Sequence, residues 1–244
     1  MPLPCRLSPI HEQLARLNPR WTTLGDMPVV ADFGDPTRER DLIGQLGLCD
    51  LSALDRTLVK GPGAAEFLAS QGLWLPDQVF GHFPQADGAL VVRTGGAEFF
   101  VENGWMANTV EQNTVGQLRR AIGASVPGVY EVPRQDVSLI ISGAAALELF
   151  SQTCGYNFGD SGYRFVMTQV AGVSSSVLPR QVQARRAWQL WADGTYGQYL
   201  WETLLAIARE LGGDAVGVDC FIGVRGNYFG GSNSSVAQRL GSSR

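Results

Sequence analysis

Apolar and polar residues are arranged along the chain in blocks that predict both strands and helices. The clearest block runs from Asp50 to Ser70. It predicts a strand over Arg56 to Lys60, a turn at Gly61-Pro62-Gly63 and then a helix, in which apolar residues recur at spacings of three and four. Pro62 or Gly63 can open that helix without the loss of an N–H that the helix needs. The block therefore predicts a strand-turn-helix unit.

The same arrangement returns at Asp136 to Phe150. Both blocks carry Asp-x-Ser, then a pair of small residues at a strand-to-helix turn, then Ala-x-Glu followed by Phe and Leu in either order. An internal duplication is the simplest explanation of this repeat. We therefore expect two similar subdomains, over residues 1–133 and 134–222, each built around one strand-turn-helix unit.

The remaining pattern predicts an α+β fold, because strands and helices fall into segregated blocks rather than one regular alternation. Gly47 is expected to end the helix before it as a left-handed cap. Residues 223–244 are rich in Gly, Ser and Asn, which predicts a flexible tail. Further helices are expected over residues 9–17, 37–46, 109–122 and 196–211, and further strands over 28–33, 89–92, 97–102, 165–170, 173–178 and 187–191.

Composition narrows the class of partner. The chain has 244 residues, 45% of them hydrophobic and 17% charged, which is typical of a globular protein. Its net charge of −4 argues against a nucleic-acid partner, because phosphate binding requires clustered basic surface. The six Trp residues leave room for a buried interface with a partner protein, since aromatic residues concentrate at such surfaces.

The cysteines and histidines are dispersed and show no metal-binding spacing. We expect the four cysteines to be reduced, mostly buried thiols, as in a cytosolic protein. No apolar run reaches the roughly 18 residues of a membrane span. The N-terminus lacks the basic-then-apolar layout of a signal peptide. The expected location is therefore the cytoplasm, without a membrane partner.

Two segments resemble a known family. Leu48 to Leu68, LCDLSALDRTLVKGPGAAEFL, resembles the G-x-F-D-x-S segment and the G-x-x-A-x-x-F-L helix of the glycine-cleavage aminomethyltransferase (T-protein) superfamily. Ser174 to Trp201, with its Asp193-Gly194 and Tyr199-Leu200-Trp201, is more similar to the gamma subunit of heterotetrameric sarcosine oxidase, a short two-domain member. The likeness covers about residues 8–210.

The resemblance implies a T-protein-like folate-binding fold of two subdomains that lacks the C-terminal β-barrel of longer members. It implies a non-catalytic subunit that scaffolds a flavin- and folate-dependent complex oxidising N-methyl amines. In that family the flavins, NAD, zinc and tetrahydrofolate sit in other subunits, so no cofactor is expected in this chain, although tetrahydrofolate stays possible. The alternative is a stand-alone folate-binding, aminomethyltransferase-like protein with a one-carbon transfer or regulatory role. Iron–sulfur-assembly relatives are disfavoured, because Cys220 lacks their flanking Lys-Gly and Gln-Glu.

The resemblance also implies where a pterin would bind. Carboxylates hold a pterin because they accept hydrogen bonds from its paired N–H donors. Gln189 falls where the family has its last pterin-binding Glu, and an amide supplies no charge there. Asp87 lies near the place of the family's hairpin acid and Asn103 matches its strand-end Asn, but Asp-Gly and Asn-Gly are also turn signals. If Asp87 lies in a turn, the place of the catalytic carboxylate falls on Val91 or Val92. We expect no catalytic residue and no metal ligand.

Other charged and aromatic residues allow several interpretations. Arg185, with Arg180 and Arg186, could hold an acidic tail such as polyglutamate, meet a negative face on a partner, or line a solvated edge strand. Glu98 and Glu102 are interpreted as a solvated strand face rather than a catalytic carboxylate pair. Strand geometry places Trp188 and Trp191 on opposite faces, and we expect at least one indole to reach a surface or an interface.

Overall fold

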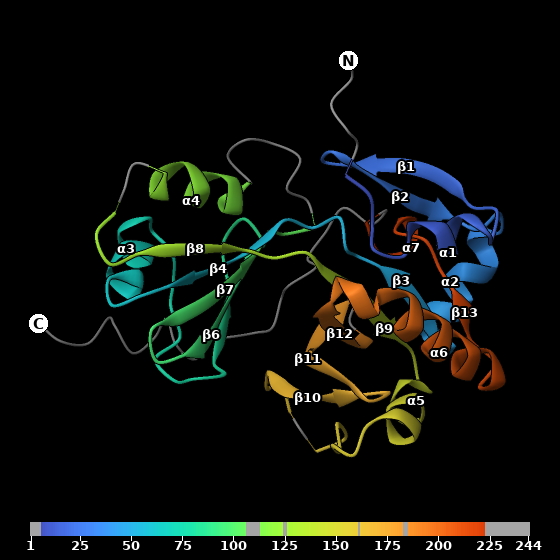
Figure 1. The fold of residues 1–244 in the computed structure, drawn as a ribbon. Helices are drawn as coiled ribbons and strands as arrows, with labels where there is room; N and C mark the ends of the chain where they lie inside the picture. The colour runs from blue at the N-terminus through green and yellow to red at the C-terminus, as the bar shows by residue number, and fades with distance from the viewer. Residues whose placement is uncertain (1–5, 106–112, 124–125, 161, 183–184, 223–244) are drawn as a thin grey trace, which may run out of the picture.

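The computed structural model describes residues 6–105, 113–123, 126–160, 162–182 and 185–222. These residues form a two-stranded, a five-stranded and a six-stranded sheet with helices around them. Figure 1 shows the two larger sheets in separate halves of the molecule, with α3 (Ala64–Ser70) and α4 (Thr114–Ile122) in one half and α5 (Ala146–Thr153) and α6 (Gly197–Glu210) in the other.

The five-stranded sheet is antiparallel throughout. One of its faces packs against α3 and α4, because alternate residues of its strands are apolar and meet the apolar faces of both helices. In spatial order its strands are β5 (His82–Pro84), β6 (Leu90–Gly95), β7 (Glu98–Glu102), β4 (Arg56–Lys60) and β8 (Tyr130–Pro133).

The six-stranded sheet packs one face against α5 and α6 in the largest apolar cluster of the described residues. All of its strand pairs are antiparallel except the pair of its last two strands. In spatial order its strands are β10 (Val166–Val170), β11 (Val173–Val182), β12 (Arg185–Asp193), β9 (Asp136–Ser142), β3 (Gly47–Asp50) and β13 (Asp214–Ala215).

The two large sheets share one order of connections. Along the chain, β4-α3-β5-β6-β7-α4-β8 is followed by β9-α5-β10-β11-β12-α6-β13, and the spatial order β5-β6-β7-β4 matches β10-β11-β12-β9. The sheets differ at one place, where β3 inserts between β9 and β13. Because β3 comes from the N-terminal part, sheet membership crosses residue 133. The division at that residue stays a prediction.

The repeated turn has the same physical basis in both halves. Gly61 and Gly143 have φ of +117° and +110°, a region that side chains rarely adopt. A Cβ at Gly61 would lie 2.3 Å from the carbonyl oxygen of Gly128, and one at Gly143 would lie 2.4 Å from that of Gln45. Each strand-to-helix turn therefore requires Gly for its conformation and for the backbone packed against it.

The Asp-x-Ser part of the predicted repeat is not equivalent in the two halves. Asp50 ends β3, whereas Asp136 begins β9. The two segments are neighbours instead, since the Ser138 N–H donates to Ser52 Oγ at 3.0 Å. Asp-x-Ser is therefore not part of the repeated unit, because its two copies lie at different places in the fold, one at the end of β3 and one at the start of β9.

A second apolar cluster lies on the other face of the six-stranded sheet near β3, and it includes Met27, Leu42, Ile43 and Phe221. Gly47 starts β3 and does not cap the preceding helix, which corrects the prediction. A Cβ at this position would lie 3.2 Å from Val216 and 3.3 Å from Ile43, which is a tight approach. The remaining elements are α1 (His11–Ala15), the hairpin β1 (Arg20–Leu24) and β2 (Met27–Asp32), α2 (Pro36–Gln45), the 3-10 helix η1 (Gly194–Tyr196) and α7 (Asp219–Ile222). Of these, β2, α2 and α7 contribute to the second cluster, whereas α1 contributes Leu14 to the first.

Most predicted elements are present, with shifted ends. The short strands β1, β5 and β13 and the helix α7 were not expected, because each is brief or lies in a turn-rich segment. The start of the predicted 109–122 helix and the predicted tail at 223–244 lie outside the described residues. None of the helices in the described residues is both long and apolar enough to cross a bilayer.

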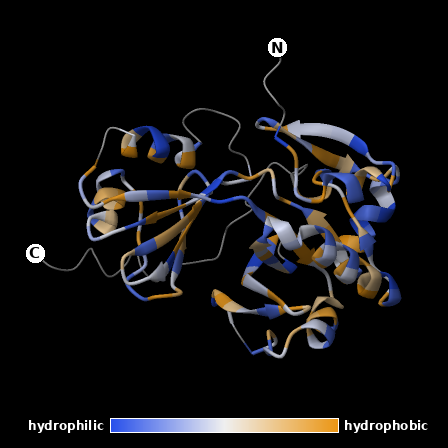
Figure 2. Ribbon diagram, viewed as in Figure 1, coloured by the Kyte–Doolittle hydropathy of each residue, from blue (hydrophilic) through white to orange (hydrophobic). Residues whose placement is uncertain are grey.

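Between the two large sheets, an inner apolar cluster joins faces that the helices leave uncovered. It contains Leu90, Val92 and Phe100 from the five-stranded sheet and Phe165, Leu178 and Trp191 from the six-stranded side. Figure 2 shows apolar residues recurring along the strands of both halves. The sheets therefore meet through side chains at the centre of the molecule.

Candidate functional site between the two sheets

A buried ion pair lies on the inner face of the five-stranded sheet. Arg56 on β4 and Glu102 on β7 are register partners, so both side chains point to the same face. The Arg56 Nε donates to the Glu102 Oε2 at 3.0 Å, and the two side chains are 2% and 1% exposed. Breaking such a pair is costly, because the remaining charge has no water around it.

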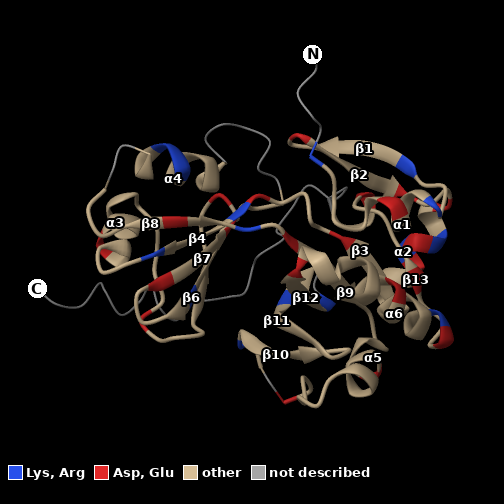
Figure 3. Cartoon of the chain, in the orientation of Figure 1, with Lys and Arg blue, Asp and Glu red and all other residues tan. Residues whose placement is uncertain are grey.

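Arg56 also contacts the other half of the molecule. Its Nη1 donates to the Asp136 carbonyl at 2.7 Å and its Nη2 to the Leu51 carbonyl at 3.1 Å. Asp136 begins β9 and Leu51 follows β3, both in the six-stranded sheet. The guanidinium therefore joins the two halves where the chain passes between them. Figure 3 shows residues of both charge signs in this central region.

Glu102 is the centre of the network. Its Oε1 accepts from the Gln189 Nε2 at 2.8 Å, and its Oε2 accepts from the Trp191 indole at 2.6 Å. Burial raises the pKa of the Glu102 carboxyl, while the charge of Arg56 opposes that shift. Both oxygens already accept hydrogen bonds, so this carboxylate holds neighbouring side chains and has little capacity left for a ligand.

Gln189 faces this interior from β12 and is 0% exposed. Besides Glu102, its Nε2 contacts the Ser138 Oγ at 3.2 Å. Its Oε1 has no hydrogen-bond partner among the described residues. The Gln189 amide N–H groups that a ligand would meet thus already donate to side chains of this protein.

A half-buried histidine and a buried arginine lie near the same space. Arg180 on β11 is 6% exposed, and burial lowers its pKa to about 10 against the opposing effect of Glu102. Burial, with the added charge of Arg180, lowers the pKa of His82 on β5 to about 4. His82 is therefore neutral at pH 7.

The predicted basic cluster does not form. Arg180 is buried between the sheets, whereas Arg185 is exposed. Arg186 points to the other face of the sheet, where it donates to the Gly162 carbonyl at 2.8 Å and lies 5.2 Å from the Trp188 ring. Strand alternation sends neighbouring residues to opposite faces, which separates charges that are adjacent in sequence.

The other two candidate residues hold the start of α4. Asp87 lies in a turn, where its Oδ2 accepts from the Thr114 Oγ at 2.5 Å and its Oδ1 from the Ala89 N–H at 3.0 Å. The Oδ1 of Asn103 accepts from the Val115 N–H at 2.9 Å. Asp87 and Asn103 thus lie near each other at α4, apart from Gln189, and Arg185 lies elsewhere near Gly44. The four candidates do not converge on one site.

Because Asp87 lies in a turn, the resemblance assigns the position of the family's catalytic carboxylate to Val91 or Val92. Val91 packs toward the helices and Val92 lies in the inner cluster. Both tryptophans of β12 are buried at 3% exposure on opposite faces, so the opposite placement is confirmed. Neither indole reaches the surface, although Trp191 lies between the sheets.

Glu102 is the site residue that sequence reasoning missed. It was interpreted as part of a solvated face, yet it is buried. A signal was present, because the predicted strand at Arg56 carries two basic residues and the predicted hairpin strand carries two acidic ones. Without the register of the two strands, nothing in the sequence showed that these charges are paired.

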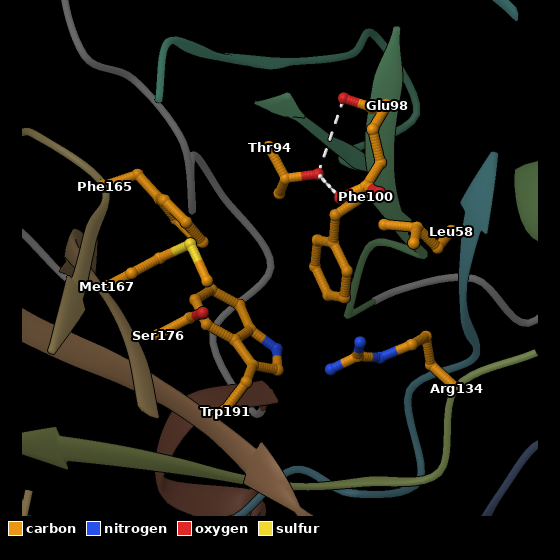
Figure 4. A pocket seen from close by; sticks show the side chains of 9 residues that line it. All are labelled: Leu58, Thr94, Glu98, Phe100, Arg134, Phe165, Met167, Ser176 and Trp191. Atoms are coloured by element: carbon orange, nitrogen blue, oxygen red, sulfur yellow. Dashed lines mark hydrogen bonds between the residues drawn. The ribbon is translucent and has the colours of Figure 1, made fainter. Parts of the chain in front are cut away.

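Two cavities remain on either side of Arg134. The smaller, of about 80 Å³, lies beside Phe100, Phe165 and Trp191 between the sheets (Figure 4). The larger is an open cleft of about 680 Å³ beside Ser52 and Asp136, where the connections between the halves pass. The described residues contain no group of three His, Cys, Asp or Glu side chains placed to hold a metal ion. Cys49, Cys154 and Cys220 form no disulfide among the described residues.

Comparison with known proteins gives likeness in structure and none in sequence. No family model and no curated protein matches the chain. Among solved structures, the glycine cleavage system aminomethyltransferase T from Bartonella henselae matches with a TM-score of 0.68 and 14% identity. That match covers 88% of this chain and 60% of the aminomethyltransferase, so the chain spans less than two thirds of its length.

A second likeness is to a chain of the heterotetrameric sarcosine oxidase from Corynebacterium sp. U-96, solved in complex with pyrrole 2-carboxylate. Its TM-score is 0.59 at 16% identity, and it covers 84% of this chain and 96% of that one. At such identities the likeness establishes the fold alone. The chain therefore has an aminomethyltransferase-like fold of mixed helices and strands, shared with a chain of a heterotetrameric oxidase.

Proposed function

We propose that this chain is a non-catalytic, sarcosine oxidase gamma-subunit-like protein, which scaffolds a flavin- and folate-dependent complex that oxidises N-methyl amines. The observation that carries the proposal is the filled space between the sheets. Glu102 accepts hydrogen bonds from Arg56 and Gln189 there, and the adjoining cavity of about 80 Å³ is far below the roughly 300 Å³ of ordinary ligand sites. A pterin would have to displace this network.

The extent of the structural matches supports the same proposal. The sarcosine oxidase chain is matched over nearly all of its length, so the two chains are of similar size. That protein is a heterotetramer, which supports membership of this chain in a multi-subunit complex. Under this proposal the flavin and folate sites belong to partner subunits. A cytoplasmic location is part of the same proposal.

The alternative is a stand-alone folate-binding protein with a one-carbon transfer or regulatory role. The open cleft of about 680 Å³ favours it, because that cleft is large enough for an extended ligand. The carboxyl groups of Asp136 and Asp193 and the Ser52 residue lie at its walls. Arg134, however, already occupies both oxygens of Asp136, at 3.0 and 2.6 Å.

Titration of the purified chain with tetrahydrofolate by calorimetry tests the two functions against each other. Under the leading proposal no saturable heat is expected. Binding in the micromolar range that is lost in Asp193→Asn, but kept in the exposed control Asp41→Asn, would overturn it in favour of the alternative.

Purification of the tagged chain from its source gives the second test. We expect polypeptides that carry flavin absorbance and oxidise N-methyl amines to co-purify in fixed stoichiometry. A chain that emerges without a flavoprotein partner would contradict the scaffold role.

A further inference from the structure

The small cavity between the sheets is lined by aromatic rings, one carboxylate, Glu98, and one guanidinium, Arg134 (Figure 4). Its volume is about 80 Å³, whereas about 10–15 Å³ on the same kind of measure holds one water. It is therefore too large for a single water and too small for a drug-sized ligand. A compact organic molecule of a few heavy atoms fits this size.

Aromatic rings form the inner wall. The centroids of Phe100 and Trp191 lie 5.6 Å apart in an edge-to-face arrangement, and those of Phe165 and Trp191 lie 6.2 Å apart. Met167 adds a thioether at the exposed side, where it is 59% exposed. Aromatic faces carry partial negative charge, and they attract alkylated ammonium groups.

Glu98 and Arg134 each keep one hydrogen-bonding atom without a partner among the described residues. Glu98 accepts from the Thr94 Oγ at 2.8 Å through Oε1, and its Oε2 accepts no hydrogen bond from the described residues. Arg134 donates through Nε and Nη2 to Asp136, while its Nη1 donates to no described residue. In Figure 4 the Glu98 carboxyl group is turned to Thr94, and Arg134 lies on a different side of the cavity. Opposite charges are thus offered at separate points of one small space.

We propose that this cavity binds a small zwitterion with a quaternary ammonium group and a carboxylate. The ammonium lies against the rings of Phe100 and Trp191 and near Glu98, and the carboxylate accepts from the Arg134 Nη1. A primary ammonium fits less well, because its three N–H donors would meet one free carboxylate oxygen and aromatic carbon. A quaternary ammonium has no donor to satisfy. The inference does not rest on the proposed function, since the chain alone forms this cavity.

Calorimetric titration of the full chain with N,N,N-trimethylglycine tests the proposal. We expect saturable one-site binding with a dissociation constant on the order of 1 mM, and about tenfold weaker binding of glycine. Glu98→Gln removes the charge facing the ammonium and is expected to weaken binding about tenfold. Phe165→Leu removes one ring and weakens it as well. The exposed Glu66→Gln on α3 is the matched charge control and leaves the affinity unchanged.

Two smaller compounds, each of which represents one half of trimethylglycine, make the test more specific. Acetate and tetramethylammonium are each expected to bind more weakly than trimethylglycine, because each meets only part of the cavity. Acetate that binds as tightly as trimethylglycine would overturn the proposal, since it would show a simple anion site at Arg134. No saturable heat at about 100 mM ligand, well above the expected dissociation constant, would also overturn it. Far-UV circular dichroism monitors folding, and if Phe165→Leu unfolds, Glu98→Gln alone decides.

Discussion

Trp191 donates its indole N–H to the carboxylate of Glu102 across the space between the two large sheets, at 2.6 Å. Trp191 comes from the six-stranded sheet and Glu102 from the five-stranded sheet. The halves are therefore held together by a charge-assisted hydrogen bond as well as by apolar contact. Such bonds are about twice as strong as neutral ones, and this one is shielded from water.

Replacement of Trp191 by Phe measures this link. We expect the free energy of unfolding to fall by about 2–3 kcal/mol more than in a control variant, because Glu102 loses a donor that water cannot replace. Trp188→Phe is the matched control, since Trp188 lies on the same strand, is equally buried and its Nε1 has no hydrogen-bond partner among the described residues. Urea unfolding measures both variants, and equal losses would show that the hydrogen bond contributes nothing.

Arg56→Met is expected to destabilise the chain by about 3–5 kcal/mol at pH 8, because it leaves the Glu102 charge buried without its partner. Arg120→Met on the exposed surface of α4 is the control and should change stability little. The double variant Arg56→Met/Glu102→Leu is expected to recover much of the loss. If the double variant is no more stable than Arg56→Met, the unpaired charge is not the cause.

The stability lost in Arg56→Met is expected to depend on pH, and the pKa of Glu102 determines the direction of that dependence. Burial raises the pKa of Glu102 in the folded chain, and removal of Arg56 removes the effect that opposes this rise. The folded state then binds the proton more tightly than the unfolded state, so stability is present below the unfolded pKa of about 4.3 and is lost as pH rises through the folded pKa. Urea unfolding should therefore show a smaller deficit at pH 4.5 than at pH 8, and a deficit that grows on acidification would contradict this.

His82 is expected to reduce stability in acid. Its folded pKa is lowered to about 4 by burial and by Arg180, so the folded state favours the neutral ring. Its contribution is complete above the unfolded pKa of about 6.5, and it is lost as pH falls toward 4, by roughly 3 kcal/mol at most. The variant His82→Gln should lack this fall in stability between pH 6.5 and 4. A carbon-bound proton resonance of His82 that titrates near 6.5 by NMR would contradict the prediction.

Gly143→Ala is expected to cost more than about 2 kcal/mol, because it combines a positive φ with a collision against the Gln45 backbone. Gly172→Ala separates these effects, since Gly172 has φ of +79° and open space around it. That control should lose only about 1 kcal/mol, the cost of the left-handed conformation. Thermal unfolding of both variants checks the difference. Equal losses would show that the close approach at Gly143 is relieved by a small shift.

Local signals were enough to predict the strand-turn-helix units. In both halves the turn Gly and the buried Ala of the helix occupy matching places, as at Gly61 with Ala64 and Gly143 with Ala146. Backbone conformation and apolar periodicity act over a few residues, so the sequence carries them directly. Very short strands such as β5 were missed, because their hydrogen-bond partners, not their own residues, make them strands.

The candidate site was predicted less well than the fold. Resemblance placed Gln189 in the interior, and it is there, but the residues proposed to join it lie at α4 or on the surface. Asp87 and Asn103 stabilise a helix start, a role that turn-forming residues commonly take. Their shared neighbourhood with Thr114 and Val115 depends on how α4 packs, and no local pattern indicates it.

By itself, the sequence determined the two repeated units and the strands and helices around them, because these depend on neighbours along the chain, while its resemblance to a known family implied an aminomethyltransferase-like fold. Only the tertiary structure decided that β3 joins the opposite sheet, that Glu102 is buried and that Arg56, Gln189 and Trp191 meet it. The reason is register: these contacts join strands far apart in sequence, and a shift by one residue would turn each side chain to the other face of its sheet.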